Sequence, residues 1–437
     1  MKKNHSIAGE MIRFSLPLIM SGILQQLYSW ADAFIVGHSG ETGELMLAAV
    51  GATGSITTLL VQTIVGFTLG LSIMAAQEYG KKNMEKLHRI TGSFGPVLAA
   101  VYTVLAFIAI ACVRPILRQM STPAEIFDYS AQYLRIVLLG VPFLAVYNLL
   151  AALLRAVGNS KASFYAVLLS SLMNVALDVL LVLVFPFGVA GAAAATVISQ
   201  IAMTVFMAAY LRKRYPELVS QGMCFDRSVF RQGLSFSMPP TLQNSVTSAG
   251  NLVLQNFMNQ FGAVTVLAIT TSYRVDSLML LPLFNLGSAI SSMTARSKGE
   301  GNAEKVRACL KTGLWLMFAV CGVLTVMMFL FGSSFVAFFG VTGEALETGR
   351  QFFRDLSLFY VPFGLATAMR SALEGIGDIS YCSAVGIGTL IIRIVFSYIF
   401  RPLMGNRAIA FAEAVAWMCL LVLMVVRLWQ KKKQKQI

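Results

Sequence analysis

Long stretches without charged residues alternate with short charged segments along almost the whole chain. No charged residue lies between Arg13 and Asp32, and none lies between Glu44 and Glu78. A helix that crosses a bilayer needs about 20 mostly apolar residues, so these stretches are long enough for transmembrane helices. The pattern therefore predicts an all-α membrane protein.

The charged residues and weak turns divide the chain into twelve predicted transmembrane helices. The predicted spans are 11–36, 46–78, 88–113, 127–154, 162–184, 188–210, 230–259, 263–295, 307–331, 347–373, 380–402 and 407–428. Arg393 and Glu413 interrupt the last two spans. Charges within a bilayer are expensive, so we expect these two residues to form a pair across their helices.

The composition agrees with a chain that is surrounded mostly by lipid. Hydrophobic residues make up 57% of the sequence and charged residues 12%, against about 25% charged in ordinary soluble proteins. These values exclude a cytosolic globular enzyme, a disordered chain and a nucleic-acid-binding module. The three histidines and the six cysteines, which have no CxxC spacing, argue against a zinc site and a disulfide framework.

The net charge of +14 has a topological explanation, because cytoplasmic loops of membrane proteins collect Lys and Arg. With both termini placed in the cytoplasm, the inner segments hold most of these residues, such as the cluster Lys81, Lys82 and Lys86. We therefore expect a multi-pass protein of the cytoplasmic membrane with both ends inside. Residues 1–10 contain no small-residue cleavage site, so the first span should remain as a membrane helix.

The second half of the sequence repeats the first at an offset near 220 residues. Phe-Ser-Leu-Pro at 14–17 recurs as Phe-Ser-Met-Pro at 236–239, and Val-Pro-Phe at 141–143 recurs at 361–363. This predicts two six-helix lobes, 1–214 and 232–437, joined by a cytoplasmic linker at 215–231. Six is even, so the lobes should be related by a pseudo-two-fold axis along the membrane normal, an arrangement that transporters use to bind substrate between halves. The alternative is a repeat retained for packing alone.

Asp32 is a charged residue within the predicted first helix, in its outer half. Gln25, Tyr28, Ser29 and Asp32 are spaced i, i+3, i+4 and i+7, so they form one polar stripe. A stripe of this kind is typical of a cavity wall, and the alternative is an aspartate that caps the helix end. Pro17, earlier in the same helix, removes a backbone hydrogen bond and permits the helix to bend.

Asn174 and Asp178 are spaced i, i+4 in the outer half of the predicted fifth helix. Two carboxylates at similar depth in one lobe would share a cavity, and their mutual repulsion and desolvation favour a proton on at least one of them. A Na⁺ ion held by carboxylate, amide and hydroxyl oxygens is an equal alternative. The remaining alternative is a hydrogen-bonded structural pair.

The second lobe contributes further candidates for a substrate cavity. Amide side chains on one face of the predicted seventh helix, Asn244, Asn251 and Gln255, suit a wall that binds without titrating, although packing between helices explains such amides as well. Asp276 lies near the middle of the eighth span, where a buried charge needs a partner from another helix.

Several of these segments together resemble the multidrug and toxic compound extrusion (MATE) family. The matching segments are Leu16-Pro17, Leu27-Tyr28, residues 32–37 (Asp-Ala-Phe-Ile-Val-Gly), 47–51 (Leu-Ala-Ala-Val-Gly), 77–80 (Gln-Glu-Tyr-Gly), 154–159 (Leu-Arg-Ala-Val-Gly-Asn), and Asn174 with Asp178. The resemblance extends over essentially the whole chain. It implies a cation-coupled antiporter, driven by H⁺ or Na⁺, that exports amphipathic and often cationic small molecules and drugs.

The resemblance also implies roles for individual residues. The acid matching Asp32 is the chief coupling residue, supported by Asn174 and Asp178. Some sodium-coupled members carry an acid on helix 7, which this chain lacks, so we expect coupling in the N-terminal half. No cofactor, resident metal or nucleic acid is implied; the partners are small molecules and lipids, and we expect a monomer. The rival interpretation is a lipid-linked oligosaccharide flippase of related architecture, which would want a wider and strongly basic cavity.

Overall fold

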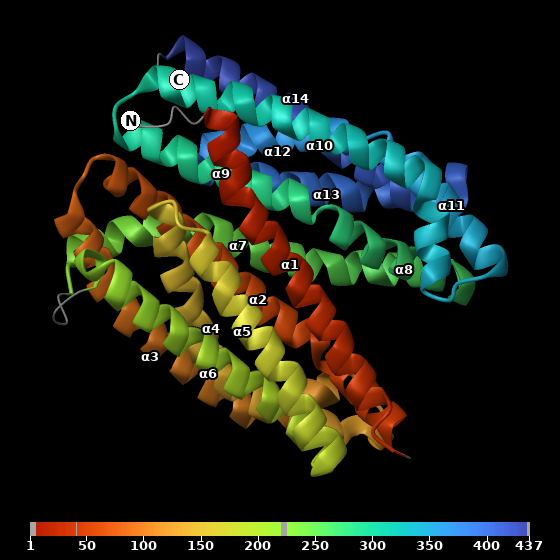
Figure 1. Ribbon diagram of the computed structural model, residues 1–437. Helices are drawn as coiled ribbons and strands as arrows, with labels where there is room; N and C mark the ends of the chain where they lie inside the picture. Colours follow the sequence, from red (N-terminus) through yellow and green to blue (C-terminus); the bar gives the residue numbers. More distant parts are fainter. Residues whose placement is uncertain (1–5, 41, 220–224, 435–437) are drawn as a thin grey trace. The chain divides into compact units, whose positions relative to one another are not determined.

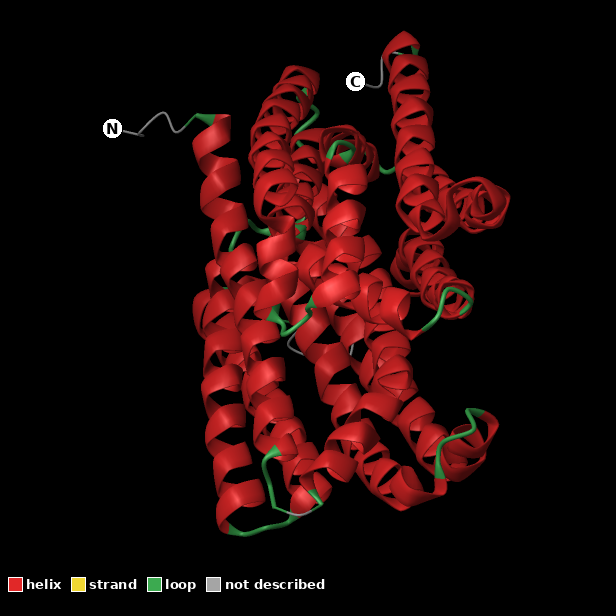
Figure 2. Cartoon of the chain, turned by 90° about the vertical axis from the view of Figure 1, so that its right-hand side faces the viewer, coloured by secondary structure: helices red, strands yellow, loops and turns green. Residues whose placement is uncertain are grey.

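The computed structural model describes residues 6–40, 42–219 and 225–434, and regular secondary structure in these ranges is entirely helical (Figures 1 and 2). The elements are α1 (Ile7–Gly37), α2 (Gly43–Gly80), α3 (Met84–Gln119), α4 (Ala124–Ala156), α5 (Lys161–Asp178), the π-helix η1 (Val179–Val184), α6 (Gly188–Arg214), η2 (Pro216–Leu218), α7 (Arg227–Asn259), α8 (Ala263–Met279), α9 (Leu281–Gly299), α10 (Ala303–Phe338), α11 (Gly343–Ser357), α12 (Tyr360–Gly375), α13 (Ile379–Met404), η3 (Gly405–Arg407) and α14 (Ala408–Lys433).

The twelve predicted spans each coincide with a helix or with a pair of helices in the described chain. Two spans, 263–295 and 347–373, were expected to be single helices, and this was wrong: each is a pair, α8–α9 bent by 40° and α11–α12 bent by 52°. Pro282 and Pro362 follow the two breaks closely, and neither can donate a hydrogen bond to the preceding turn. A proline two or three residues into the second helix thus accompanies both breaks.

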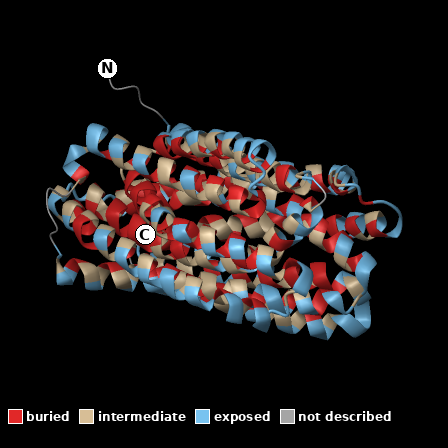
Figure 3. Ribbon diagram, turned by 90° about the horizontal axis from the view of Figure 1, so that it is seen from below, coloured by how far each residue is buried: buried red, intermediate tan, exposed pale blue. Residues whose placement is uncertain are grey.

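Several helices present broad apolar faces to their surroundings. On α3, Phe107 and Ile108 are 63% and 56% exposed, and on α10 Val323 is 67% exposed. Among the described helices, eight stretches are individually long and apolar enough to cross a membrane, and ten if each bent pair counts as one. Figure 3 shows exposed residues along the helices. Apolar surface of this extent marks contact with lipid in a chain of this length. The prediction of an all-α, multi-pass membrane protein is confirmed.

Packing divides the chain into two compact units. Unit 1 contains residues 1–19 and 238–437, and unit 2 contains residues 20–237. In unit 2, α4 packs against α2, α3 and α6, and in unit 1, α12 packs against α9, α10 and α14. The boundaries at 19/20 and 237/238 lie inside α1 and α7, within three residues of Pro17 and Pro239. The axis relating the sequence halves and the lobe boundaries 1–214 and 232–437 stay predictions.

The opening turns of α1 and α7 therefore pack outside their own sequence halves. In unit 1, Phe14 and Leu18 of α1 form a buried cluster with Ala289 of α9. In unit 2, α7 approaches α2 so closely that a Cβ on Gly70 would lie 2.2 Å from the Phe236 carbonyl oxygen. Only glycine fits at this contact, so Gly70 determines where the first turns of α7 pack against α2.

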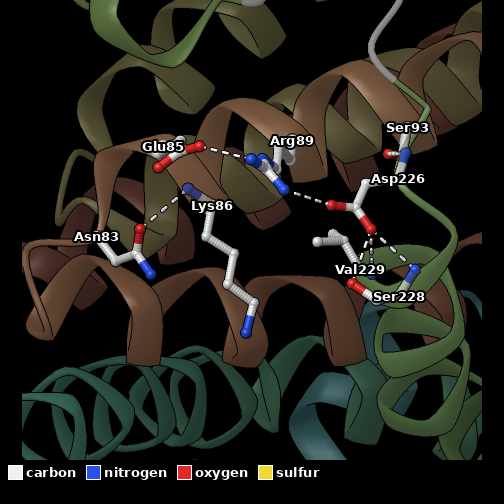
Figure 4. Close-up of polar contacts among 8 residues, drawn as sticks. All are labelled: Asn83, Glu85, Lys86, Arg89, Ser93, Asp226, Ser228 and Val229. Atoms are coloured by element: carbon white, nitrogen blue, oxygen red, sulfur yellow. Dashed lines mark hydrogen bonds and ion pairs between the residues drawn. The ribbon is translucent and has the colours of Figure 1, made fainter.

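Asp226, at the end of the linker, starts α7 and attaches it to α3 within unit 2 (Figure 4). One carboxylate oxygen accepts hydrogen bonds from the backbone N–H groups of Ser228 and Val229, at 2.8 and 3.1 Å. The other oxygen lies 2.7 Å from the Arg89 guanidinium, which also contacts Glu85. Hydrogen bonds from Ser228 and Val229 and the nearby guanidinium hold the pKa of Asp226 well below its usual range.

Candidate functional site

The three predicted coupling residues meet within unit 2. Asp32 comes from α1, and Asn174 and Asp178 come from the last turns of α5. Asp32 and Asp178 lie close enough for their charges to interact. At Asp178 the α-helix changes into the π-helix η1, a feature that occurs often at functional sites. That the two acids share a cavity stays a prediction, because neither of them lines the cavity described below.

Buried polar atoms at this site lack protein partners. Asn174 is 2% exposed and Asp178 is fully buried. Within the described residues, the following buried atoms have no hydrogen-bond partner: both carboxylate oxygens of Asp178, both amide atoms of Asn174 and Oδ1 of Asp32. A buried carboxylate without a partner is costly, and two of them side by side repel each other. The group therefore has the chemistry of a site that takes up a proton or a small cation.

Two tyrosines border the acid pair. Tyr28 lies one helical turn before Asp32 on α1 and interacts with it electrostatically. Tyr133 of α4 is 7% exposed and interacts electrostatically with both Asp32 and Asp178. The phenol rings exclude water while their hydroxyl groups offer hydrogen bonds. Tyr133 escaped the sequence analysis because the sequence does not show which helices face Asp32 and Asp178.

A polar cavity of about 210 Å³ lies in unit 2 beside the acid pair. Asn174, which is one turn from Asp178, and Tyr28 both line it, so the cavity and the acids share side chains. Its wall mixes apolar and hydrogen-bonding groups, as small-molecule sites do. The lining residues are Gln25, Tyr28, Val61, Val65, Leu144, Tyr147, Asn148, Val167, Ser170, Asn174, Thr196, Ser199, Gln200 and Met203.

The cavity wall includes two amides that sequence reasoning missed, Asn148 of α4 and Gln200 of α6. Of the cavity residues predicted on α1, Gln25 and Tyr28 line it, whereas Ser29 is exposed and does not. Gln200 interrupts an apolar helix, and this isolated amide was the available signal. Its Oε1 atom is buried without a partner in the described chain.

The cavity residues predicted on α7 lie in unit 1. Asn244 is half-buried, Asn251 is exposed, and the Gln255 side chain donates a 3.0 Å hydrogen bond to Asn259. A wall formed by these amides stays a prediction.

Unit 1 contains a second buried polar group, centred on α8, α12, α13 and α14. The predicted pair of Arg393 and Glu413 is confirmed, with 3.0 Å between the guanidinium nitrogen and Oε2. Tyr273 completes a triangle, because it donates to Glu413 at 3.0 Å and accepts from Arg393 at 2.7 Å. Asp276 is 5% exposed and accepts a hydrogen bond from the Tyr360 hydroxyl. Asp276 has thus found a partner from another helix.

A family model matches most of the sequence. The MatE family model matches residues 17–180 and 239–399, which correspond to the two repeated halves.

Among curated relatives, the "Probable multidrug resistance protein YoeA" of Bacillus subtilis is 28% identical over 88% of this chain and 85% of its own length. The "Probable multidrug resistance protein NorM" of Thermotoga maritima is 24% identical over 85% of this chain and 81% of its own. These matches extend over both halves of the chain.

Solved structures show the same fold. A chain described as "MATE in the bent conformation" superposes with a TM-score of 0.91 at 21% identity, covering 99% of this chain and 98% of that one. A second, described as the outward-facing conformation of a multidrug resistance MATE family transporter, gives a TM-score of 0.89 at 21% identity, covering 98% and 97%.

Proposed function

Because the chain belongs to the MatE family, we propose that it is a cation-coupled antiporter that exports amphipathic, often cationic small molecules. The family consists of membrane transporters, and the relatives named above carry names that refer to multidrug resistance. The observation that carries the proposal is the acid pair Asp32 and Asp178 beside a cavity: within the described residues, both oxygens of Asp178 and Oδ1 of Asp32 are buried without a hydrogen-bond partner.

The coupling step uses the charge of this pair. When the cavity faces outward, a proton or Na⁺ ion neutralises Asp32, with Asn174 and Asp178 beside it. Neutralisation weakens the attraction for a cationic substrate and favours its release. The ion leaves on the cytoplasmic side, and the ionised pair then attracts the next substrate. One charge that crosses 100 mV supplies about 2.3 kcal/mol, enough to drive a sizeable gradient.

The proposal includes a location and an assembly state. We place the chain in the cytoplasmic membrane with both termini inside, because Lys and Arg concentrate in the segments assigned to that side. Each turnover requires the carboxylates and cavity of unit 2 from a single chain, so a monomer suffices. Tyr28 and Tyr147, which line the cavity, offer aromatic faces for a cationic substrate.

Transport in inside-out membrane vesicles tests the proposal. A fluorescent cationic dye is followed while a pH gradient or a Na⁺ gradient is imposed, one at a time. We expect one of the gradients to drive dye movement, and Asp32→Asn to abolish it. The control is Asp128→Asn, because Asp128 is an exposed acid paired with Arg114 at 3.0 Å and should be dispensable. Full ion-driven transport by the Asp32→Asn variant would refute the assignment.

A further inference from the structure

The buried polar group of unit 1 contains two carboxylates and one guanidinium. Arg393 lies 3.0 Å from Glu413, and Tyr273 bonds to both, so these three side chains satisfy one another. Asp276 is held by the Tyr360 hydroxyl, which is neutral. If both acids are ionised, the group has an excess of one negative charge. A buried net charge in a membrane protein is expensive, so this excess needs a compensating positive charge.

The neighbours of Asp276 identify it as the acid that carries the excess. Glu413 on α14 is already neutralised by Arg393 on α13. From α12 comes Tyr360, which has no exposed surface, and α10 contributes Cys321, a neutral thiol that interacts with Tyr360. From its own helix comes Tyr273, already bonded to Glu413 and Arg393. The remaining charge therefore belongs to Asp276.

The location of this carboxyl group favours a functional rather than a purely structural charge. Asp276 lies in the last turn of α8, just before the break to α9, and Tyr360 is the first residue of α12, just after the break from α11. Their hydrogen bond thus joins two interrupted membrane helices at their breaks. Interrupted helices in transporters mark sites where ions or substrates bind, because the backbone there is free to move.

We propose that Asp276 binds and releases a proton, as a second titrating site independent of the pair in unit 2. Its carboxylate takes a proton from water and becomes a neutral carboxylic acid, and the reverse step returns the proton and restores the charge. A proton needs no shell of oxygen ligands, whereas Na⁺ would need several oxygens beside the positive Arg393. The inference extends the proposed antiport function, but the site can be tested without transport.

Trp417 provides a reporter at the site. Its ring stacks on Phe363 with a centroid separation of 4.3 Å and lies 5.9 Å from the ring of Tyr360. The other three tryptophans, Trp30, Trp315 and Trp429, are replaced by Phe so that Trp417 alone emits. The purified full-length chain in nanodiscs is then titrated with acid, and the emission of Trp417 is followed.

We expect a single titration of Trp417 emission that Asp276→Asn abolishes and Asp32→Asn leaves intact. Tyr360→Phe should retain the titration but move its midpoint to higher pH, because the ionised carboxylate loses its hydrogen-bond donor. This second variant keeps the test valid if Asp276→Asn fails to fold.

Three results would overturn the inference: no titration in the parent protein, an unchanged titration in Asp276→Asn, or a response to Na⁺ at fixed pH in place of one to protons. None of these depends on dye export. A parent protein that transports dye without a Trp417 titration would refute only this inference. Loss of ion-driven export in every assay with the titration intact would refute only the proposed function.

Discussion

The two units of the chain arise from one repeated sequence but hold their buried charges differently. In unit 2, α2 and α4 run without a break, the charges of Asp32 and Asp178 interact, and neither oxygen of Asp178 has a hydrogen-bond partner within the described residues. In unit 1, the corresponding segments are the bent pairs α8–α9 and α11–α12, and a guanidinium neutralises Glu413. One copy has therefore kept an uncompensated acid pair beside a cavity, whereas the other has compensated most of its charge.

This difference separates groups that stabilise the fold from groups that function at the expense of stability. Removing one partner of a buried ion pair strongly destabilises the folded protein, because the other charge remains buried and unpaired. An uncompensated acid pair already bears that penalty in the native state. Removing one charge from the ion pair of unit 1 and one from the acid pair of unit 2 should therefore change stability in opposite directions.

The largest expected effect is in unit 1. Arg393→Met leaves Glu413 buried without its partner and should lower the free energy of unfolding by about 3–5 kcal/mol. The double variant Arg393→Met/Glu413→Leu should recover most of this loss, because no charge is stranded. Thermal unfolding of the detergent-solubilised protein measures both. Arg350→Met is the control, since Arg350 is 46% exposed and pairs with an exposed glutamate. Equal losses in the single and double variants would contradict the charge explanation.

The next effect tests the contact between α2 and α7 in unit 2. Gly70→Ala places a Cβ against the Phe236 backbone, and we expect destabilisation of about 1–3 kcal/mol from overpacking. Gly51→Ala in the same helix is the matched control, because a Cβ there meets no atom within 4 Å. It should be neutral or slightly stabilising, as alanine favours helices. Similar thermal midpoints for the two variants would show that the close approach is relaxed in the membrane.

A smaller effect of opposite sign is expected at the acid pair. Asp178→Asn removes the repulsion with Asp32 and should raise the free energy of unfolding by about 1 kcal/mol, while ion-driven dye transport falls. Asp128→Asn, in an exposed pair, should change neither quantity. Thermal midpoints and vesicle transport are compared on the same preparations. A destabilised Asp178→Asn variant would show that the two acids are held together by favourable bonds.

The smallest effect is at the linker, where Asp226 caps α7. Its pKa is lowered in the folded protein, so its stabilising contribution is present above the unfolded-state pKa of an aspartate and is lost as the pH falls through the folded value. Asp226→Asn should lower the thermal midpoint slightly near neutral pH and make no difference in strong acid. Glu85→Gln, which alters the exposed second partner of Arg89, is the control. A difference that persists in strong acid would exclude the charge as the cause.

The sequence predicted the helices better than it predicted their breaks. The span 88–113 lies within α3 (Met84–Gln119), because a long apolar run between charged residues has few other structures open to it in lipid. The break between α11 and α12 falls at Leu358 and Phe359, two apolar residues that are not typical turn formers. Hydropathy does not distinguish one bent span from one straight span.

The candidate site was predictable in its residues but only partly in its contacts. Charges within apolar runs identified Asp32, Asp178 and Asp276, because lipid tolerates each of them only for a reason. Which helix faces which is not encoded in spacing along one helix, so Tyr133 and Tyr360 were missed. Arg393 and Glu413 were matched correctly because they are opposite charges in the interiors of consecutive spans, away from the span ends.

The first turns of α1 pack in unit 1 and the first turns of α7 pack in unit 2, which affects whether either half of the sequence can fold alone. Met11 of α1 has no exposed surface in unit 1, so a separately expressed N-terminal half would leave this residue without its packing partners. The C-terminal half would in turn take Phe230 and Phe236 away from their neighbours in unit 2. Neither half of the sequence therefore contains all the residues of one compact unit.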